Sequence, residues 1–193
     1  CDVISNEEAK AFFPEVNHTS LVSVDQIIDL DHEGLKIFED RSQDFVIINH
    51  VIEHLFDPIS AIVECFRVLR PNGFLILSVP DKRFTFDCNR PLTSNQDIFE
   101  RVKRIPKEPN PVDYFDMLQF VHPELLDESA EVKEDALKGF HRRREHLNIW
   151  TDQSFLSFID EVLHQKKIKS ILTNKVLSNE NQFEFFGIWK KLL

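Results

Sequence analysis

Apolar residues along the chain form two kinds of pattern, one typical of buried strands and one of helices. Residues 44–49 (DFVIIN) are apolar through their middle, which predicts a strand buried on both faces of a parallel sheet. Residues 58–69 place apolar side chains on one helical face, at Ile59, Ile62, Val63, Phe66 and Leu69. Residues 71–73 (PNG) form a turn, and residues 74–79 (FLILSV) are again apolar. This order predicts a strand–helix–strand unit with a right-handed crossover.

The last quarter of the chain repeats both patterns. Thr151 is a typical helix cap, and it precedes an amphipathic segment over residues 152–165. Residues 168–177 and 182–192 are strand-like, and the turn-forming residues 178–181 join them. We expect an antiparallel hairpin at the edge of the sheet.

The remaining segments are less regular. Residues 7–13 predict a short helix, and residues 21–30 alternate in the manner of a strand. Residues 84–150 contain several prolines and much of the mixed charge, which predicts loops with short helices. Such a long insertion in a compact domain is typically functional, for example a lid or a substrate wall. The length of 193 residues fits one domain over residues 1–193.

Composition narrows the function classes. The formal net charge of −10 disfavours nonspecific binding to nucleic acid or to an anionic membrane. Three widely spaced cysteines form neither a disulfide framework nor a zinc pattern, so we expect a reducing, cytoplasmic setting. No apolar run approaches the roughly 18 residues of a membrane span.

Residues 44–83 carry a dense motif. Its members are Asp44, Glu53-His54, Asp57-Pro58, Glu64, Arg67-Val68-Leu69, Pro71 and Gly73. The run resembles the middle of class I S-adenosylmethionine-dependent methyltransferases of the type 11 group, although Asn72 departs from the usual turn residue. The resemblance implies an α/β fold: a three-layer Rossmann-like sandwich, with a mostly parallel sheet and an antiparallel C-terminal hairpin. It also implies S-adenosylmethionine as the cofactor.

The resemblance assigns cofactor-binding residues. Asn49 and His50, just past the first buried strand, would line the methionine side of the cofactor, since ligands of open parallel sheets bind beyond the carboxyl ends of the strands. Asp29 and the backbone of Leu30 would read the adenine edge, and Asp2 would bind the ribose hydroxyls. The alternative for Asp29 is an ordinary turn aspartate, and the alternative for His50 and His54 is that they only cap and orient their loop.

One family feature is absent from the sequence. The first strand and its G-x-G-x-G loop belong before residue 2, and the four glycines present form no such loop. Such a loop lets backbone approach the cofactor closely. Two hypotheses follow: the sequence is an N-terminally truncated piece of a methyltransferase, or it is a degenerate, non-catalytic methyltransferase-like binding module.

The segment after the second strand suggests a substrate site. Residues 81–93 resemble a PDKRFTFDxxRPLT run found in a subgroup of bacterial methyltransferases. Lys82, Arg83 and Arg90 would hold an anionic or polyhydroxyl substrate, the alternative being a salt-bridged loop scaffold. His54 and His146 are candidate bases, and the catalytic residue itself stays open.

Two further patterns resemble a metal site and an anion-binding site. Residues 50–54 (HVIEH) match an inverted zinc-peptidase motif, but a zinc site needs two histidines one turn apart on a helix, and this segment adjoins a buried strand. We therefore expect no metal. Residues 141–146 form a basic island, which is either a solvated helix face or an anion-binding wall of the substrate pocket.

Together these observations predict an enzyme that transfers a methyl group to a small-molecule or glycan-type acceptor. Its expected partners are that acceptor and, as a candidate assembly, a second copy in a homodimer. Nucleic acid and membrane are not expected as partners.

Overall fold

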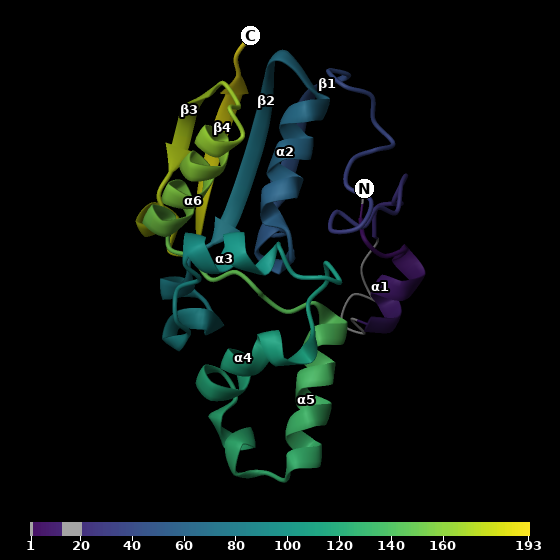
Figure 1. Ribbon diagram of the computed structural model, residues 1–193, viewed down its shortest axis with the longest axis vertical. Coiled ribbons are helices and arrows are strands. Elements are labelled where there is room, and N and C mark those ends of the chain that lie inside the picture. The colour runs from purple at the N-terminus through teal and green to yellow at the C-terminus, as the bar shows by residue number, and fades with distance from the viewer. Residues whose placement is uncertain (1, 13–20) are drawn as a thin grey trace.

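The computed structural model describes residues 2–12 and 21–193. In this part of the chain, a four-stranded sheet has the order β1-β2-β4-β3 (Figure 1). Its strands are β1 (Gln43–Asn49), β2 (Leu69–Pro80), β3 (Ser170–Val176) and β4 (Glu184–Lys191). Strands β1 and β2 run parallel, whereas β4 is antiparallel to both β2 and β3. The predicted parallel unit and C-terminal hairpin are therefore confirmed.

The helices fall into two groups. The α-helices are α1 (Asn6–Phe12), α2 (Pro58–Val68), α3 (Asn95–Arg101), α4 (Phe115–Phe120), α5 (Ala130–Arg143), α6 (Asp152–Gln165) and the single turn α7 (Ser178–Asn181). The short 3-10 helices are η2 (Ile52–His54), η3 (Lys82–Phe84), η4 (Phe86–Asn89), η5 (Pro111–Tyr114) and η6 (Pro123–Asp127). None of the described helices is long and apolar enough to cross a membrane.

Local chemistry explains why α2 and α6 begin where the sequence predicts. The Asp57 side chain accepts a hydrogen bond from the Ser60 backbone N–H, and Thr151 caps α6 through the N–H of Ser154. The strand after α2 begins earlier than predicted, at Leu69, because Leu69 already pairs with Gln43, and the turn residues form an irregularity before the regular pairing resumes at Phe74. Asn72 adopts the left-handed conformation there, with φ of 68°.

Two strand predictions need correction. Residues 21–30 form no strand: the described structure has only a parallel bridge between Asp2 and Ile27. Apart from this bridge, no strand among the described residues lies beside the segment to form the backbone hydrogen bonds of a sheet with it. Strand β1 is not buried on both faces either, because Phe45 is 58% and Ile47 is 52% exposed.

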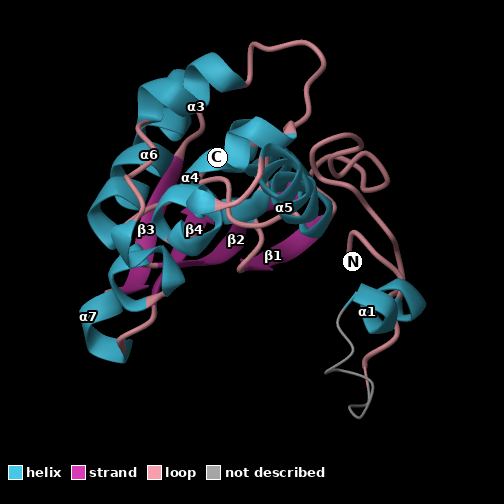
Figure 2. Ribbon diagram, turned by 90° about the horizontal axis from the view of Figure 1, so that it is seen from below, coloured by secondary structure: helices cyan, strands magenta, loops and turns pink. Residues whose placement is uncertain are grey.

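The exposed side of β1 continues across the sheet. Val46 and Ile48 of β1 face a core that includes residues of α2 and α6, and both helices lie in front of the strands in Figure 1. The register places Ile47, Ile76 and Ile188 in one row on the opposite face. In the described part of the chain, long helices therefore cover one face of the sheet. The three layers expected from the sequence would place helices on both faces. Figure 2 shows α6 to one side of the strands.

The insertion after β2 occupies the space beyond the carboxyl ends of β1 and β2, below the sheet in Figure 1. It has its own small core of Phe56, Tyr114, Met117 and Leu147. The prediction of loops with only short helices was wrong for α5, which is 14 residues long. None of its residues is buried, so the helix has a mostly charged sequence without the apolar face by which a helix is predicted. The insertion thus covers the sheet edge at which ligands of such folds bind.

Gly187 of β4 offers a direct test of the core. A Cβ at this position would lie 2.6 Å from ring atoms of Trp189 and 3.0 Å from the Phe185 ring, and both rings are buried. We expect Gly187→Ala to lower the free energy of unfolding by about 1–3 kcal/mol, measured by urea denaturation. The control is Gly139→Ala in α5, where a Cβ meets nothing within 4 Å and should stabilise the helix. Equal stability of both variants would contradict the packing described here.

Candidate functional site

The candidate site begins where β1 ends. His50 has φ of 52°, and its backbone N–H still donates to the carbonyl of Ser78 on β2. The chain then makes the single turn η2. The backbone carbonyl of Glu53 accepts from the N–H groups of Leu147 and Asn148, at 2.8 and 2.9 Å. The loop after β1 is therefore fixed to a segment more than 90 residues away.

Glu53 lies at the centre of the site. Its side chain is completely buried, and within the described part of the chain neither carboxylate oxygen accepts a hydrogen bond. Burial raises the pKa of Glu53 to about 7. A buried carboxylate without hydrogen-bond partners is costly, because it has lost its hydration and gained no hydrogen bond in exchange.

Three histidines surround this carboxylate. His50 Nδ1 lies 3.6 Å and His54 Nε2 lies 3.7 Å from Glu53 Oε1. The rings of His54 and His146 meet edge to face, with centroids 4.8 Å apart. Burial, together with the neighbouring His146, lowers the pKa of His54 to about 4, so this ring is neutral at physiological pH.

A buried ion-pair network holds His146. Its Nδ1 lies 2.6 Å from Asp87 Oδ2, and Arg90 binds Asp87 at 2.7 Å and Asp116 at 2.8 Å. Arg90 also donates to the backbone carbonyl of His146. Burial raises the pKa of Asp87, but His146 and Arg90 outweigh it, and the pKa stays below its usual range. An ionised Asp87 favours the His146 tautomer with its proton on Nδ1 and a free Nε2.

Two exposed aromatic rings flank the histidines. Phe86 stacks on His146 at 4.9 Å and Phe183 stacks on His50 at 5.0 Å. Each of these phenylalanines is about half exposed. Glu184 completes this side of the site, since its carboxylate lies 2.6 Å from His50 Nε2. The arrangement offers proton-accepting groups between apolar rings.

The residues predicted to bind the cofactor lie along this same edge. Asn49 is exposed at the end of β1, and His50 is half-buried beside it. Asp29 is half-buried; one of its oxygens accepts from the Asp31 N–H and the other from the guanidinium of Arg144. Burial raises the pKa of Asp29, but Arg144 outweighs it, and the pKa is lowered.

Leu30 and Asp2 are the remaining cofactor candidates. Leu30 follows Asp29 in the same turn and packs partly against the core. The exposed Asp2 pairs its backbone with Gln26 and Ile28, and its carboxylate accepts from the N–H of Val3. Asp2 is thereby joined to the segment that leads to Asp29.

Hydrogen bonds fix the segment of Asp29 relative to the loop that follows Asn49 and His50. The turn at Asp29 is tied to the loop after β1, because Asp31 accepts from the N–H groups of Phe56 and Asp57. An ionised Asp29 and the polar groups of Asn49 and His50 are therefore held near one edge. The described chain supplies no glycine-rich turn for the amino-acid end of the cofactor.

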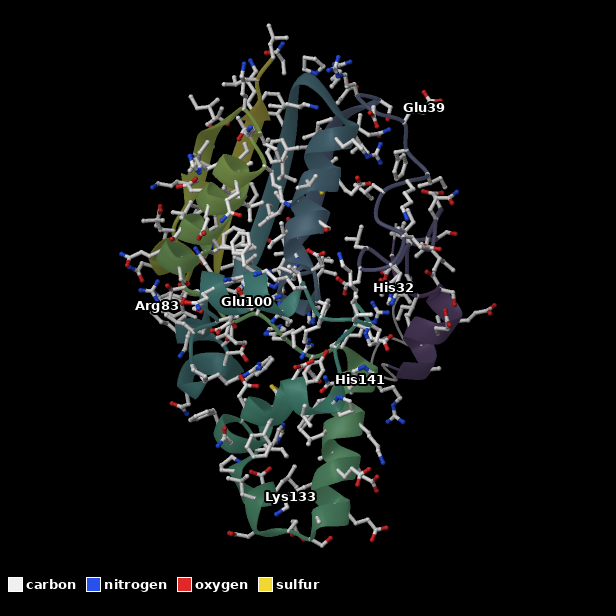
Figure 3. The ribbon with its side chains drawn as sticks, viewed as in Figure 1. His32, Glu39, Arg83, Glu100, Lys133 and His141 are labelled. Carbon is white, nitrogen blue, oxygen red and sulfur yellow. The ribbon has the colours of Figure 1, made fainter. Side chains whose placement is uncertain are left out.

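The predicted substrate residues have internal contacts. Arg83 binds Asp81 and Asp152, and Figure 3 places it at the margin of the molecule. The Lys82 ammonium donates to the backbone carbonyl of Arg90. Arg90 is 1% exposed, so its guanidinium is available to the ion-pair network and not to a ligand in this conformation. The structure therefore favours the scaffold alternative for Arg90.

Sequence reasoning did not select Glu53, Asp87 or Arg144 as site residues. Glu53 entered the sequence analysis only as a member of the Glu53-His54 motif and of the HVIEH pattern, and the two flanking histidines were the available signal. Arg144 was included only in the basic island, and its left-handed backbone after α5 turns it toward Asp29. No sequence pattern links residues 115 positions apart.

Comparisons with known proteins find similarity to methyltransferases. Residues 4–77 match the methyltransferase domain family. A probable S-adenosylmethionine-dependent methyltransferase from Mycolicibacterium smegmatis is 43% identical over 65 residues, which are 33% of this chain and 25% of that protein. Another, from Mycobacterium tuberculosis, is 47% identical over 51 residues, 26% of this chain and 18% of that protein. The chain thus spans a quarter or less of these relatives.

One solved structure shows the fold alone. A putative zinc-dependent alcohol dehydrogenase from Rhodobacter sphaeroides is 14% identical, with a TM-score of 0.52. The alignment covers 95% of this chain and 69% of that one. The α/β architecture is therefore shared beyond the matched segment.

Proposed function

We propose that this chain belongs to the class I S-adenosylmethionine-dependent methyltransferases, whose domain family its residues 4–77 match, and that its protein transfers a methyl group to a small-molecule or glycan-type acceptor. The observation that carries the proposal is spatial. The family-matched segment includes β1, and the end of that strand leads into a buried cluster of Glu53, His54 and His146. An insertion covers the same edge, as expected of a substrate wall.

The chemistry divides between cofactor and protein. S-adenosylmethionine supplies, when bound, an electrophilic methyl group on a sulfonium. Asp29 and Asn49 would hold and orient it, and positioning dominates such a transfer. Either His54 or His146 would take up the proton of an acceptor hydroxyl at Nε2, since Arg144 O and Asp87 occupy their Nδ1 atoms.

The acceptor class rests on the surroundings of the histidines. Phe86 and Phe183 expose ring faces, and Glu184 adds a carboxylate beside His50. Apolar faces beside hydrogen-bonding groups match the mixed surface of a sugar ring or another polyhydroxyl compound. Lys82 and Arg83 lie beside this segment and remain candidates for an anionic group on the acceptor.

Cofactor binding is tested with S-adenosylhomocysteine. At about 100 times its dissociation constant it should stabilise the protein by about 2.7 kcal/mol, read as a rise in Tm. Asp29→Asn should weaken its binding roughly tenfold, because a charged hydrogen-bond acceptor is lost. The matched control is Asp25→Asn, an exposed aspartate of the same segment, which should bind as the unaltered chain does.

The same measurement separates the two functional hypotheses. The chain and any longer natural form of the protein are compared. Binding in at least one form supports a methyltransferase. No shift in either form would overturn the proposal and favour a non-catalytic binding module. Cytoplasmic location and a homodimer stay predictions.

A further inference from the structure

The proposed methyl transfer gives the buried side chain of Glu53 no role. Its carboxylate is buried and has no hydrogen-bond partner in the described part of the chain, although its backbone carbonyl is bound twice. Native proteins rarely leave a buried carboxylate in this state, and an ion is a common explanation. Of the three histidines around it, His50 binds Glu184 through Nε2, whereas His54 and His146 make their hydrogen bonds through Nδ1.

Three ligand atoms converge at this point. One atom each from Glu53, His54 and His146 lie within 4.8 Å of one another. An ion about 2.0–2.2 Å from each atom needs only a small further approach of the side chains. Between two of these atoms, His54 Nε2 and Glu53 Oε1, the distance is 3.7 Å.

The outer contacts of both histidines suit metal binding. His54 Nδ1 lies 2.6 Å from the backbone carbonyl of Arg144, and His146 Nδ1 lies 2.6 Å from Asp87. Each contact holds a proton on Nδ1 and leaves the lone pair on Nε2. Metal-binding histidines commonly have such a carbonyl or carboxylate behind them. Arg90 in turn fixes Asp87 at 2.7 Å.

We propose that Glu53, His54 and His146 bind one divalent first-row transition-metal ion, with open coordination positions for a ligand. Two imidazoles and one carboxylate favour ions such as Zn²⁺, Co²⁺, Mn²⁺ or Fe²⁺ over Mg²⁺, which prefers oxygen ligands. The site differs from the inverted zinc-peptidase pattern. His50 turns to Glu184, η2 is a single 3-10 turn, and His146 takes its place from a distant segment.

The inference goes beyond the proposed function and does not require it. If the protein methylates a hydroxyl, an ion here would bind that oxygen and lower its pKa, replacing the histidines as the activating group. Metal binding is measurable without methyl donor or acceptor, so failure of one proposal leaves the other open to its own test.

The test uses tag-free, chelator-treated protein titrated with Co²⁺ and Zn²⁺. We expect one ion per chain, a visible Co²⁺ absorption band of a nitrogen- and oxygen-ligated site, displacement of Co²⁺ by Zn²⁺, and a higher Tm with metal. Glu53→Gln, His54→Gln and His146→Gln should each weaken binding more than a hundredfold. Asp87→Asn, which alters the outer contact of His146 and also removes the charge paired with Arg90, should weaken it about 10–100-fold in protein whose metal-free unfolding curve shows that it folds.

Controls keep the result interpretable. His164→Gln removes an exposed histidine of α6 and should leave affinity unchanged. Glu53→Gln removes a buried unpartnered charge, so its metal-free Tm should equal or exceed that of the unaltered chain, which shows that it folds. The proposal is overturned if the unaltered chain binds no stoichiometric metal, or if Glu53→Gln folds and binds as tightly. It is also overturned if His164→Gln weakens binding as much as His54→Gln.

Discussion

Replacing Arg90 by methionine is expected to lower the free energy of unfolding by about 3–5 kcal/mol, because it leaves buried charges without their partner. The guanidinium is 1% exposed and binds Asp87 at 2.7 Å and Asp116 at 2.8 Å. It also donates to the carbonyl of His146. Methionine fills part of the volume but cannot satisfy either carboxylate. Urea unfolding monitored by circular dichroism measures the loss.

The control for Arg90→Met is Arg142→Met, an exposed arginine of α5. That substitution should change the free energy of unfolding by no more than about 0.5 kcal/mol. If Arg90 instead bound substrate, Arg90→Met would leave stability intact and raise KM alone. This outcome would contradict the structural role assigned to Arg90.

Asp81→Asn is expected to cost about 3 kcal/mol, near the lower end for a broken buried ion pair. The Asp81 carboxylate is buried at the end of β2 and accepts from Arg83 at 2.7 Å and from the Ser178 hydroxyl at 2.7 Å. It also accepts from the Asp152 N–H, which starts α6. The carboxylate therefore joins the end of β2 to α6 and α7. Arg83 is half exposed, so in the Asp81→Asn variant it still contacts water and Asp152. These contacts limit the loss in the free energy of unfolding.

The Asp81 contribution should depend on pH. Burial raises its pKa, but Arg83 and the other donors outweigh this, and the pKa is lowered below the ordinary carboxyl range. The unfolded chain therefore takes up the proton first, and the stabilisation is present near neutrality and lost as pH falls below about 4. Unfolding curves should show the difference between the unaltered chain and Asp81→Asn shrinking on acidification. Asp160→Asn, an exposed aspartate of α6, should show no such convergence. A difference that stays constant with pH would refute this role of Asp81.

Local sequence determined most of the secondary structure near the sheet. The apolar runs and caps that predict β1, α2 and α6 depend on neighbouring residues only, such as Asp57 before Pro58. The C-terminal hairpin was equally readable, because a strand on each side of turn residues has few other ways to pair. The dense run around Glu53-His54 also indicated the family.

Sequence periodicity failed where a neighbour decides the structure. Residues 21–30 have a strand pattern, but apart from the single bridge at Ile27 the described chain offers them no partner. Phe45 and Ile47 are apolar yet exposed, since burial depends on what packs against the sheet and not on the residue itself.

The candidate site shows the same division. Sequence alone identified His54 and His146 as candidate bases and located the carboxyl edge of β1 as the place for a ligand. Tertiary structure alone brought Glu53 between them, set Asp87 and Arg90 behind His146, and turned Arg144 toward Asp29. These contacts join segments up to 115 residues apart, and no local propensity specifies which distant groups meet once the insertion folds over the sheet edge.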